Sequence, residues 1–281
     1  MPCVLVTLGD LVEDVVVELG SPMNHASDTD ARITRRRGGS AANVAAAAGR
    51  LGGRARFVGQ VGDDAVGASL VADLSAAGVD VSCVRRAGRT ATIVVLVDAT
   101  GERTMLVDPG SARDLDRPES AWLDGAEVLH LTLYSLLDEP IATTSRELTS
   151  LARARGIPVS VDVSSVALIV EAGPSAVREL VESLEPAIVF ANADEARVLE
   201  IDGALGGAAV VVKRGAAPAS VLRPGRAPVE VPAVALDHRA DSTGAGDAFA
   251  AGVLTFDHWR SDLVGACERG HLTAHELLAT R

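Results

Sequence analysis

The sequence predicts an α/β protein with a three-layer α/β/α fold, a mostly parallel central sheet and a small β-sheet that forms a lid. The regular alternation of apolar strand-like and helical segments in the second half of the chain is typical of such a sheet. Three stretches, 12–19, 31–37 and 92–108, alternate too much to be buried parallel strands. We therefore expect one domain over 1–281, with these stretches inserted in it as lid strands.

The elements follow from hydrophobic patterning and from glycine stops. The β-branched run at 3–10 ends at Gly9-Asp10 and predicts a buried strand, and the alanine-rich run at 40–51 predicts a helix that ends before Gly52-Gly53. The same patterns predict further strands over 56–61, 128–133, 159–163, 187–191 and 208–213, and further helices over 66–77, 140–155 and 176–184.

The composition excludes several classes of protein. With 48% hydrophobic and 23% charged residues, the chain is typical of a globular protein. A net charge of −12 and an aromatic content of only 2% argue against nucleic-acid binding, which needs clustered cations and exposed rings. The one basic run, Arg35–Arg37, is short, and we expect it to be a solvated turn.

The sequence also indicates the compartment. It contains no apolar run of about 20 residues, and acids interrupt the N-terminal segment where a secretion signal would need an apolar stretch. Its three cysteines lack metal-site or disulfide spacing. We expect a cytoplasmic protein without a membrane partner.

The segment 241–252, DSTGAGDAFAAG, carries the strongest chemical signal. A turn of small residues runs directly into an apolar helix, and glycines let the free amides at a helix N-terminus approach an anion. Asp247 lies in the first helical turn, where it could accept a proton from an attacking hydroxyl. The alternative is a capping acid in an ordinary loop.

Two further segments are weaker by themselves. In GGSAANVAAAAGRLGG at 38–53, the glycine pair lets a sugar ring approach the backbone and Asn43 offers both a donor and an acceptor, although Asn43 could equally be a local cap. The acids of GDLVED at 9–14 follow the first strand, on the side of an α/β sheet where ligands bind. A solvated turn explains Asp10 and Glu13 equally well, and Asp14 less well.

With these segments, the chain resembles the ribokinase-like (PfkB) family of carbohydrate and nucleoside kinases, whose sheet is Rossmann-like. The resemblance rests on four ordered motifs: the two segments at 38–53 and 241–252, together with VGQVGDDAVG at 58–67 and ANADEA at 191–196. It implies an ATP-dependent enzyme that phosphorylates a sugar hydroxyl with the help of Mg²⁺. A nucleoside kinase of this family, or a non-catalytic sugar-binding regulator on the same fold, are the alternatives.

The resemblance also implies roles for individual residues. Asp247 matches the catalytic base, and Gly244, Ala245 and Gly246 match the anion hole. The remaining matches are Asp14, Gly39 and Asn43 for the acceptor sugar, Asn192, Lys213 and Gly215 for the nucleotide, Glu195 for Mg²⁺ through water, and Asp241 and Thr243 for a monovalent cation.

Two departures from the family pattern bear on these roles. Relatives carry a sugar-contacting acid where this chain has Tyr134, which could contact a different ring or lie at the edge of the core. They also continue beyond the position of Arg281, in a region that helps bind the monovalent cation, so dependence on K⁺ is doubtful. The lid's edge strands could pair two copies into a homodimer or be covered within one chain.

Two other nucleotide-binding classes are excluded by missing motifs. The first predicted strand is followed by GDLVED and not by GxGxxG, which a Rossmann dehydrogenase would need there. The sequence has no GxxxxGK[ST] motif of a Walker-type NTPase.

Overall fold

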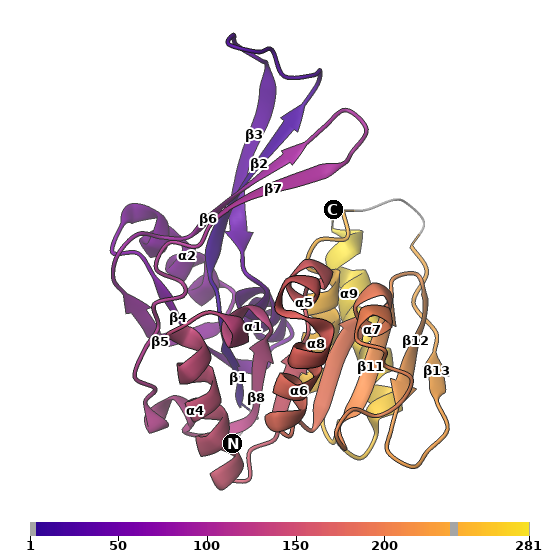
Figure 1. The fold of residues 1–281 in the computed structure, drawn as a ribbon. Coiled ribbons are helices and arrows are strands. Elements are labelled where there is room, and N and C mark those ends of the chain that lie inside the picture. Colours follow the sequence, from indigo (N-terminus) through magenta and orange to yellow (C-terminus); the bar gives the residue numbers. More distant parts are fainter. Residues whose placement is uncertain (1–3, 237–240, 281) are drawn as a thin grey trace.

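The computed structural model describes residues 4–236 and 241–280 of the chain, and a nine-stranded sheet forms its centre (Figure 1). The strands lie in the order β13-β12-β11-β10-β9-β8-β1-β4-β5 and are parallel from β11 to β5, whereas β12 pairs antiparallel with β11 and β13 pairs antiparallel with β12. Their bounds are β1 (Val4–Leu8), β4 (Arg54–Val61), β5 (Val79–Arg86), β8 (Ala126–Thr132), β9 (Val159–Asp162), β10 (Ile188–Asn192), β11 (Ala209–Arg214), β12 (Ala217–Leu222) and β13 (Val229–Val231).

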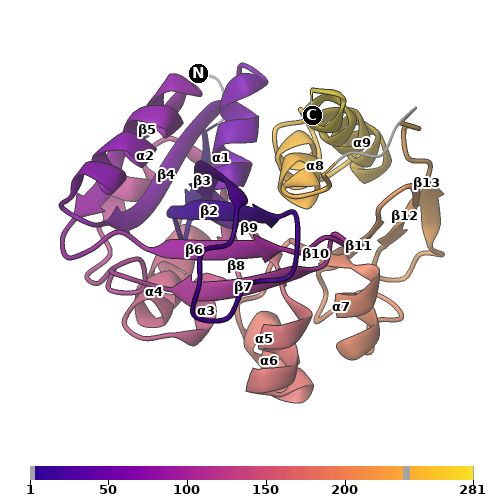
Figure 2. The same ribbon diagram turned by 90° about the horizontal axis from the view of Figure 1, so that it is seen from above.

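Helices cover both faces of this sheet, because alternate side chains of the strands point to opposite faces (Figure 2). On one face, strand residues such as Val6 and Leu8 join one buried cluster, and on the other face Leu5 and Phe57 join a second. The first cluster includes α3 (Tyr134–Leu137), α4 (Ile141–Ala154), α5 (Val166–Ala172), α6 (Pro174–Ser183) and α7 (Ala193–Val198), and the second includes α1 (Ser40–Arg50), α2 (Ala65–Ala76), α8 (Ala245–Leu254) and α9 (Leu263–Ala279).

A second sheet of four strands forms the lid. Its order is β3-β2-β6-β7, where β2 and β6 are parallel and the outer pairs are antiparallel. It projects from one end of the α/β body in Figure 1. The bounds are β2 (Val12–Leu19), β3 (Ala31–Gly38), β6 (Thr92–Val97) and β7 (Arg103–Asp108).

The structure confirms the predicted fold class of a mostly parallel α/β/α sheet with a smaller sheet beside it. The strand predicted over 3–10 corresponds to β1, and Cys3 lies outside the described residues. Several elements were not predicted: the short helices α3, α5 and α7, and also β5, β12, β13 and α9. Strand β5 and helix α9 lack a clear pattern because they are half-exposed, and β12 and β13 are short strands at the sheet edge.

Candidate active site

Several residues that the sequence singles out, together with Asp162, lie beyond or at the carboxyl ends of the parallel strands. This is the edge at which open α/β sheets bind ligands, because the chain leaves each strand there through a loop or a helix N-terminus. Asp10 follows β1, Tyr134 follows β8, Asp162 ends β9, Asn192 ends β10 and Lys213 lies near the end of β11.

Asp247 is held by two side chains from helix α1. Ser40 Oγ donates to Asp247 Oδ1 at 2.6 Å, and Asn43 Nδ2 donates to Oδ2 at 3.0 Å. Burial raises the pKa of the Asp247 carboxyl, and the nearby charge of Asp162 adds to this, while the two hydrogen bonds oppose it. The carboxyl is therefore fixed in one orientation and is a stronger base than an exposed aspartate.

The turn before Asp247 has the conformation that its glycines predict. Gly244 adopts a left-handed φ of 77° and is the N-cap of α8. A Cβ at Gly246 would lie 3.2 Å from Lys213 Nζ, so this backbone is close to a cation. The amide of Ala245 donates to the Ser242 carbonyl at 3.0 Å, a bond that it would have to release in order to bind an anion.

The glycine pair before α1 packs against two acids. A Cβ at Gly38 would lie 2.3 Å from Asp14 Oδ1, and a Cβ at Gly39 would lie 2.3 Å from the Asp10 carbonyl oxygen. Gly39 also has a φ of 96°, which favours glycine. Burial raises the pKa of Asp14 against the opposing charge of Arg36. Without side chains at 38 and 39, the lid strand β2 approaches α1 closely enough to bring Asp14 to the pocket.

The prediction that Arg35–Arg37 is a solvated turn is wrong. These residues lie in strand β3, and two of them point to the site. Arg36 Nη1 lies 3.1 Å from Asp241 Oδ2, and the side chain of Arg37, only 9% exposed, donates to Asn43 Oδ1 at 2.8 Å. Their acceptors lie elsewhere in the sequence, so the local run of charge could not reveal them.

Asp241 is bonded by cations from two lid strands. Arg103 Nη2 donates to Asp241 Oδ1 at 2.8 Å and Arg103 Nη1 donates to Thr243 Oγ1 at 2.7 Å, in addition to the contact from Arg36. Burial alone would raise the pKa of Asp241, but the hydrogen bonds from Thr243, Arg103 and Arg36 hold it well below its usual range. These two guanidinium groups already neutralise the carboxylate, so the residues present do not fit a monovalent cation at this side chain.

A second charged cluster joins the ends of β9, β10 and β11. Lys213 Nζ donates to Asp162 Oδ2 at 2.5 Å. The same Nζ lies over the ring of Phe190, 5.8 Å from its centroid. Burial by itself lowers the pKa of Lys213, but the charge of Asp162 and its hydrogen bond raise this pKa by more, so the net effect is an increase. Burial and the charge of Asp162 raise the pKa of Glu195 to about 7.

Asn192 and Glu195 form a capping box at the start of α7. Glu195 Oε1 accepts from Asn192 Nδ2 at 2.6 Å, and Asn192 Oδ1 accepts from the Glu195 amide at 2.9 Å. Gly215 lies in the turn between β11 and β12 with a φ of 60°, and it does not line the pocket described below. The Asn192–Glu195 pair therefore has a structural role at the start of α7, besides any role in ligand binding.

The donor set fits Mg²⁺ in its usual mode. Within residues 4–236 and 241–280 no group of three or more His, Cys, Asp or Glu side chains is arranged to hold a metal ion. Mg²⁺ is commonly held by one or two carboxylates, while phosphates and water complete its shell. Asp162 and Glu195, which interact electrostatically at the strand ends, could supply those carboxylates.

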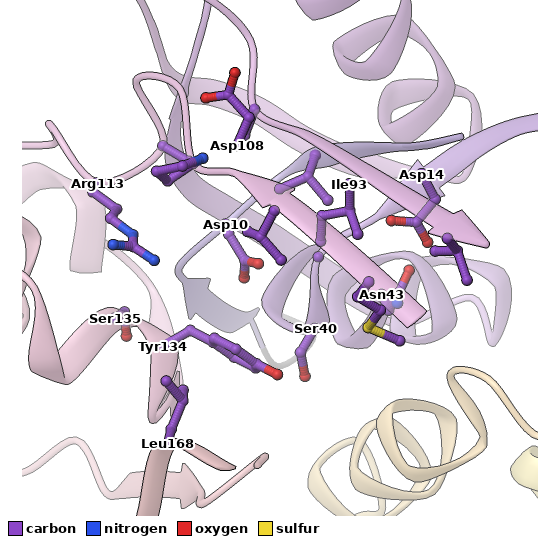
Figure 3. A pocket seen from close by; sticks show the side chains of 18 of the residues that line it. Asp10, Asp14, Ser40, Asn43, Ile93, Asp108, Arg113, Tyr134, Ser135 and Leu168 are labelled. Atoms are coloured by element: carbon purple, nitrogen blue, oxygen red, sulfur yellow. The ribbon is translucent and has the colours of Figure 1, made fainter. Parts of the chain in front are cut away.

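A pocket of about 380 Å³ lies between the lid and the body (Figure 3). Asp14, Gly39, Asn43, Tyr134 and Asp247 all line it, as do Thr243 and Gly244. The residues predicted to contact the acceptor are thus brought together with Asp247, the predicted base, and with the start of the predicted anion turn. Asn192, Glu195, Lys213 and Gly215 lie outside its lining.

Sequence reasoning missed four residues of this site: Ser40, Arg103, Asp162 and, in part, Asp10. Ser40 lies inside the motif at 38–53, but its hydrogen-bond acceptor, Asp247, is distant in the sequence, so the sequence alone could not indicate the bond. Asp10 was equally well explained as a solvated acid, yet its Oδ1 is buried. A signal was available for Asp162, which ends an otherwise apolar strand, because a buried acid at that position needs a partner.

Comparison with known proteins assigns the chain to a family. The model of the pfkB family of carbohydrate kinases matches residues 5–280. A fructokinase from Klebsiella pneumoniae is 32% identical over 88% of this chain and 82% of that protein. An ATP-dependent ribose-1-phosphate kinase from Halopiger xanaduensis is 35% identical over 84% of this chain and 78% of that protein.

Solved structures agree with this match. The crystal structure of adenosine kinase from Sinorhizobium meliloti superposes with a TM-score of 0.83 at 25% identity, covering 99% of this chain and 94% of that one. The chain belongs to the pfkB family, and it is a carbohydrate kinase. None of its described helices is long and apolar enough to cross a membrane.

Proposed function

We propose that this kinase transfers the γ-phosphoryl group of ATP to a hydroxyl of a sugar, with Asp247 as the general base. The acceptor oxygen forms a bond to the γ-phosphorus while the bond from that phosphorus to the β,γ-bridging oxygen breaks, and ADP leaves. The hydroxyl proton passes to an Asp247 carboxylate oxygen.

The observation that carries the proposal is the position of Asp247. Its carboxyl lines the pocket and lies in the first turn of α8, directly after the glycine turn. A carboxyl whose pKa is raised by burial takes a hydroxyl proton more readily than an exposed one. The helix N-terminus and Lys213 Nζ, close to Gly246, provide positive potential for the transferring group.

The phosphate side of the site would bind the nucleotide and its metal. Asp162 and Glu195 would hold Mg²⁺, which neutralises phosphate charge when bound. In this arrangement Lys213 exchanges its bond with Asp162 for a phosphate oxygen, and Asn192 keeps Glu195 in position through the capping box. Gly215, in the turn after β11, would approach the nucleotide with its backbone.

The acceptor is a sugar, either free or within a larger molecule. The named relatives include a fructokinase, a ribose-1-phosphate kinase and an adenosine kinase, and these names support both kinds of acceptor. Asp14, Gly39 and Asn43 would contact the sugar hydroxyls from the lid side and from α1. Tyr134 faces the same pocket and would contact the ring.

The lid also offers a surface for a homodimer. Its outer strands β3 and β7 each have one edge without a neighbouring strand within the described sheet, and both carry exposed apolar side chains, Ile33 at 60% and Leu106 at 55%. Unpaired strand edges of this kind pair readily with a second copy. Sedimentation at micromolar concentration measures this directly, and a monomer mass of 28.8 kDa would contradict it.

The test is ADP release from Mg-ATP with a panel of sugars and nucleosides. We expect at least one acceptor to give release well above the rate of ATP hydrolysis without acceptor. Calorimetric titration with the same panel measures binding independently. Binding of a sugar without ADP production at saturating Mg-ATP would contradict a kinase and favour a regulator.

A further inference from the structure

The pocket has more apolar wall than a free sugar would cover. Tyr134 and Leu168 lie on one side and Ile93 on the other, with Asp10 between them in the view of Figure 3. The lid adds Val95, Met105 and Val107, and the body adds Leu137 and Ile141. A monosaccharide presents hydroxyls on nearly every carbon, and these would leave much of this wall in contact with water.

Several of these apolar side chains are exposed to solvent. Met105 is 58% exposed, Val107 is 57% exposed and Tyr134 is 41% exposed. Alternate residues of β7 point to one face, which explains why Met105 and Val107 line the pocket together with Arg103. Tyr134 and Leu137 of α3 line the same pocket, and an occupant with two apolar faces would bury side chains of both the lid and α3.

The charges of the pocket favour an uncharged occupant. Each arginine in its lining is ion-paired with an acid: Arg36 and Arg103 with Asp241, and Arg113 with Asp138 at 3.2 Å. Arg36 also lies 3.6 Å from Asp14 through its Nε, and the carboxylates of Asp10 and Asp247 line the pocket as well. A phosphate on the acceptor would meet these acids without a cation to receive it.

Asp10 adds a polar requirement. Its Oδ1 is buried and lacks a hydrogen-bond partner within the described residues, although the side chain lines the pocket. A buried carboxylate oxygen left without a donor is costly, and a ligand O–H or N–H would satisfy it. Asp10 and Asp14 together therefore favour an acceptor that brings hydrogen-bond donors.

We propose that the acceptor is an uncharged nucleoside. The inference rests on the kinase function proposed above and specifies its substrate. The ribose hydroxyls bond to Asp14, Asn43 and Asp10, and one of them faces Asp247. The planar base lies between Tyr134 and Leu168 on the body and the apolar side chains of β6 and β7 on the lid, where a ring stacks or packs edge-on.

The first experiment compares free sugars, a sugar phosphate and nucleosides as acceptors. ADP release gives kcat/KM for ribose, adenosine, inosine, cytidine, fructose and ribose 1-phosphate. Calorimetry without ATP gives the affinity of the Asp247→Asn variant for each of them. We expect at least one nucleoside to exceed ribose and fructose by about tenfold or more in both measurements, as burial of a ring predicts. A free sugar or ribose 1-phosphate that exceeds every nucleoside, or the absence of nucleoside binding, overturns the inference.

The same design separates this inference from the function on which it rests. A nucleoside that binds tightly to Asp247→Asn, while the wild type releases no ADP, supports the nucleoside pocket and contradicts the kinase. ADP release with fructose alone supports the kinase and contradicts the nucleoside.

The second experiment removes apolar wall from the lid. Met105→Ser and Val107→Ser should each raise the KM for the preferred nucleoside about fivefold and leave the KM for ribose within about twofold, since ribose does not reach this wall. Val170→Ser on α5 is the matched control, because Val170 is 60% exposed and lies outside the lining. Equal increases for nucleoside and ribose would show that the lid contacts the sugar, and would overturn the placement of the base.

Discussion

Ser40 and Asn43 control how strongly Asp247 holds a proton. Both donate hydrogen bonds to its carboxylate and so lower its pKa, against burial that raises it. A general base must be deprotonated in the free enzyme, so its pKa sets the acidic limb of kcat/KM. If Asp247 is the base, as proposed, the hydroxyl of Ser40 at the start of α1 tunes the pH range of the reaction.

Replacing Ser40 by alanine should move that limb to higher pH. The loss of a donor to the carboxylate raises the pKa of Asp247, so more of the enzyme is protonated at a given acidic pH. We expect the midpoint to shift upward by about one pH unit, with a smaller change on the plateau at alkaline pH. Ser40→Thr keeps the hydroxyl and is the control, and an unshifted limb in Ser40→Ala would contradict the assignment.

The buried carboxylate of Asp10 should lower the free energy of unfolding of the ligand-free protein at neutral pH. Burial raises its pKa from an ordinary value of 3.8 to about 6, and the charges of Asp247 and Asp14 add to this. The folded state then binds the proton more tightly than the unfolded state, so stability contributed by this group decreases as pH rises through this window.

Asp10→Asn tests that cost and the ligand role together. At pH 8 the variant should be more stable to urea by up to about 3 kcal/mol, the equivalent of the shift, and the gain should vanish near pH 4. Acceptor affinity should decrease at the same time, because an amide is a poorer acceptor for ligand donors. A loss of stability at pH 8 would contradict an uncompensated carboxylate at this position.

At the scale of the elements, the lid is tied to the anion turn by charge. Strands β3 and β7 place Arg36 and Arg103 on one carboxylate, Asp241, six residues before Asp247. Since the lid also lines the pocket, its position and that of the turn are coupled. Sequence patterning predicted the lid strands, but it could not predict this coupling, because the three residues are distant in the chain.

The same contacts predict that activity does not depend on K⁺. The guanidinium groups supply the positive charge at Asp241, so a monovalent cation would add little there. Exchange of KCl for tetramethylammonium chloride at constant ionic strength should change kcat/KM by less than about twofold, a change too small to indicate a bound ion. Activation by K⁺ of more than tenfold would contradict this interpretation.

The core elements were the easiest to predict. Buried strands such as β1 and β8 are short apolar runs, and α1 is rich in alanine because Ala41, Ala42 and Ala45 pack fully buried against the sheet. Elements at the edges, such as β5 and β13, contain mixed residues and lack such a pattern. A strand that is buried on both faces is a continuous apolar run, and such a run is easily recognised in the sequence.

For the whole molecule, the order of strands places distant motifs at one edge. Strands β1, β8, β9, β10 and β11 are consecutive neighbours in the sheet, so residues at their carboxyl ends meet although they are up to about two hundred positions apart. Motifs predicted Asp14, Asn43 and Asp247, which do line one pocket. Asp162 and Arg103 belong to no such motif, and only the fold brings them to the site.

The central claim is that Asp247 is the base of a phosphoryl transfer. The most direct measurement is kcat of Asp247→Asn with a working acceptor at saturating Mg-ATP, beside calorimetric binding of ATP and a thermal melt as controls for folding. We predict that kcat decreases by a factor on the order of 10² or more, with ATP affinity and the melting temperature nearly unchanged. A variant that retains the full kcat would contradict the account.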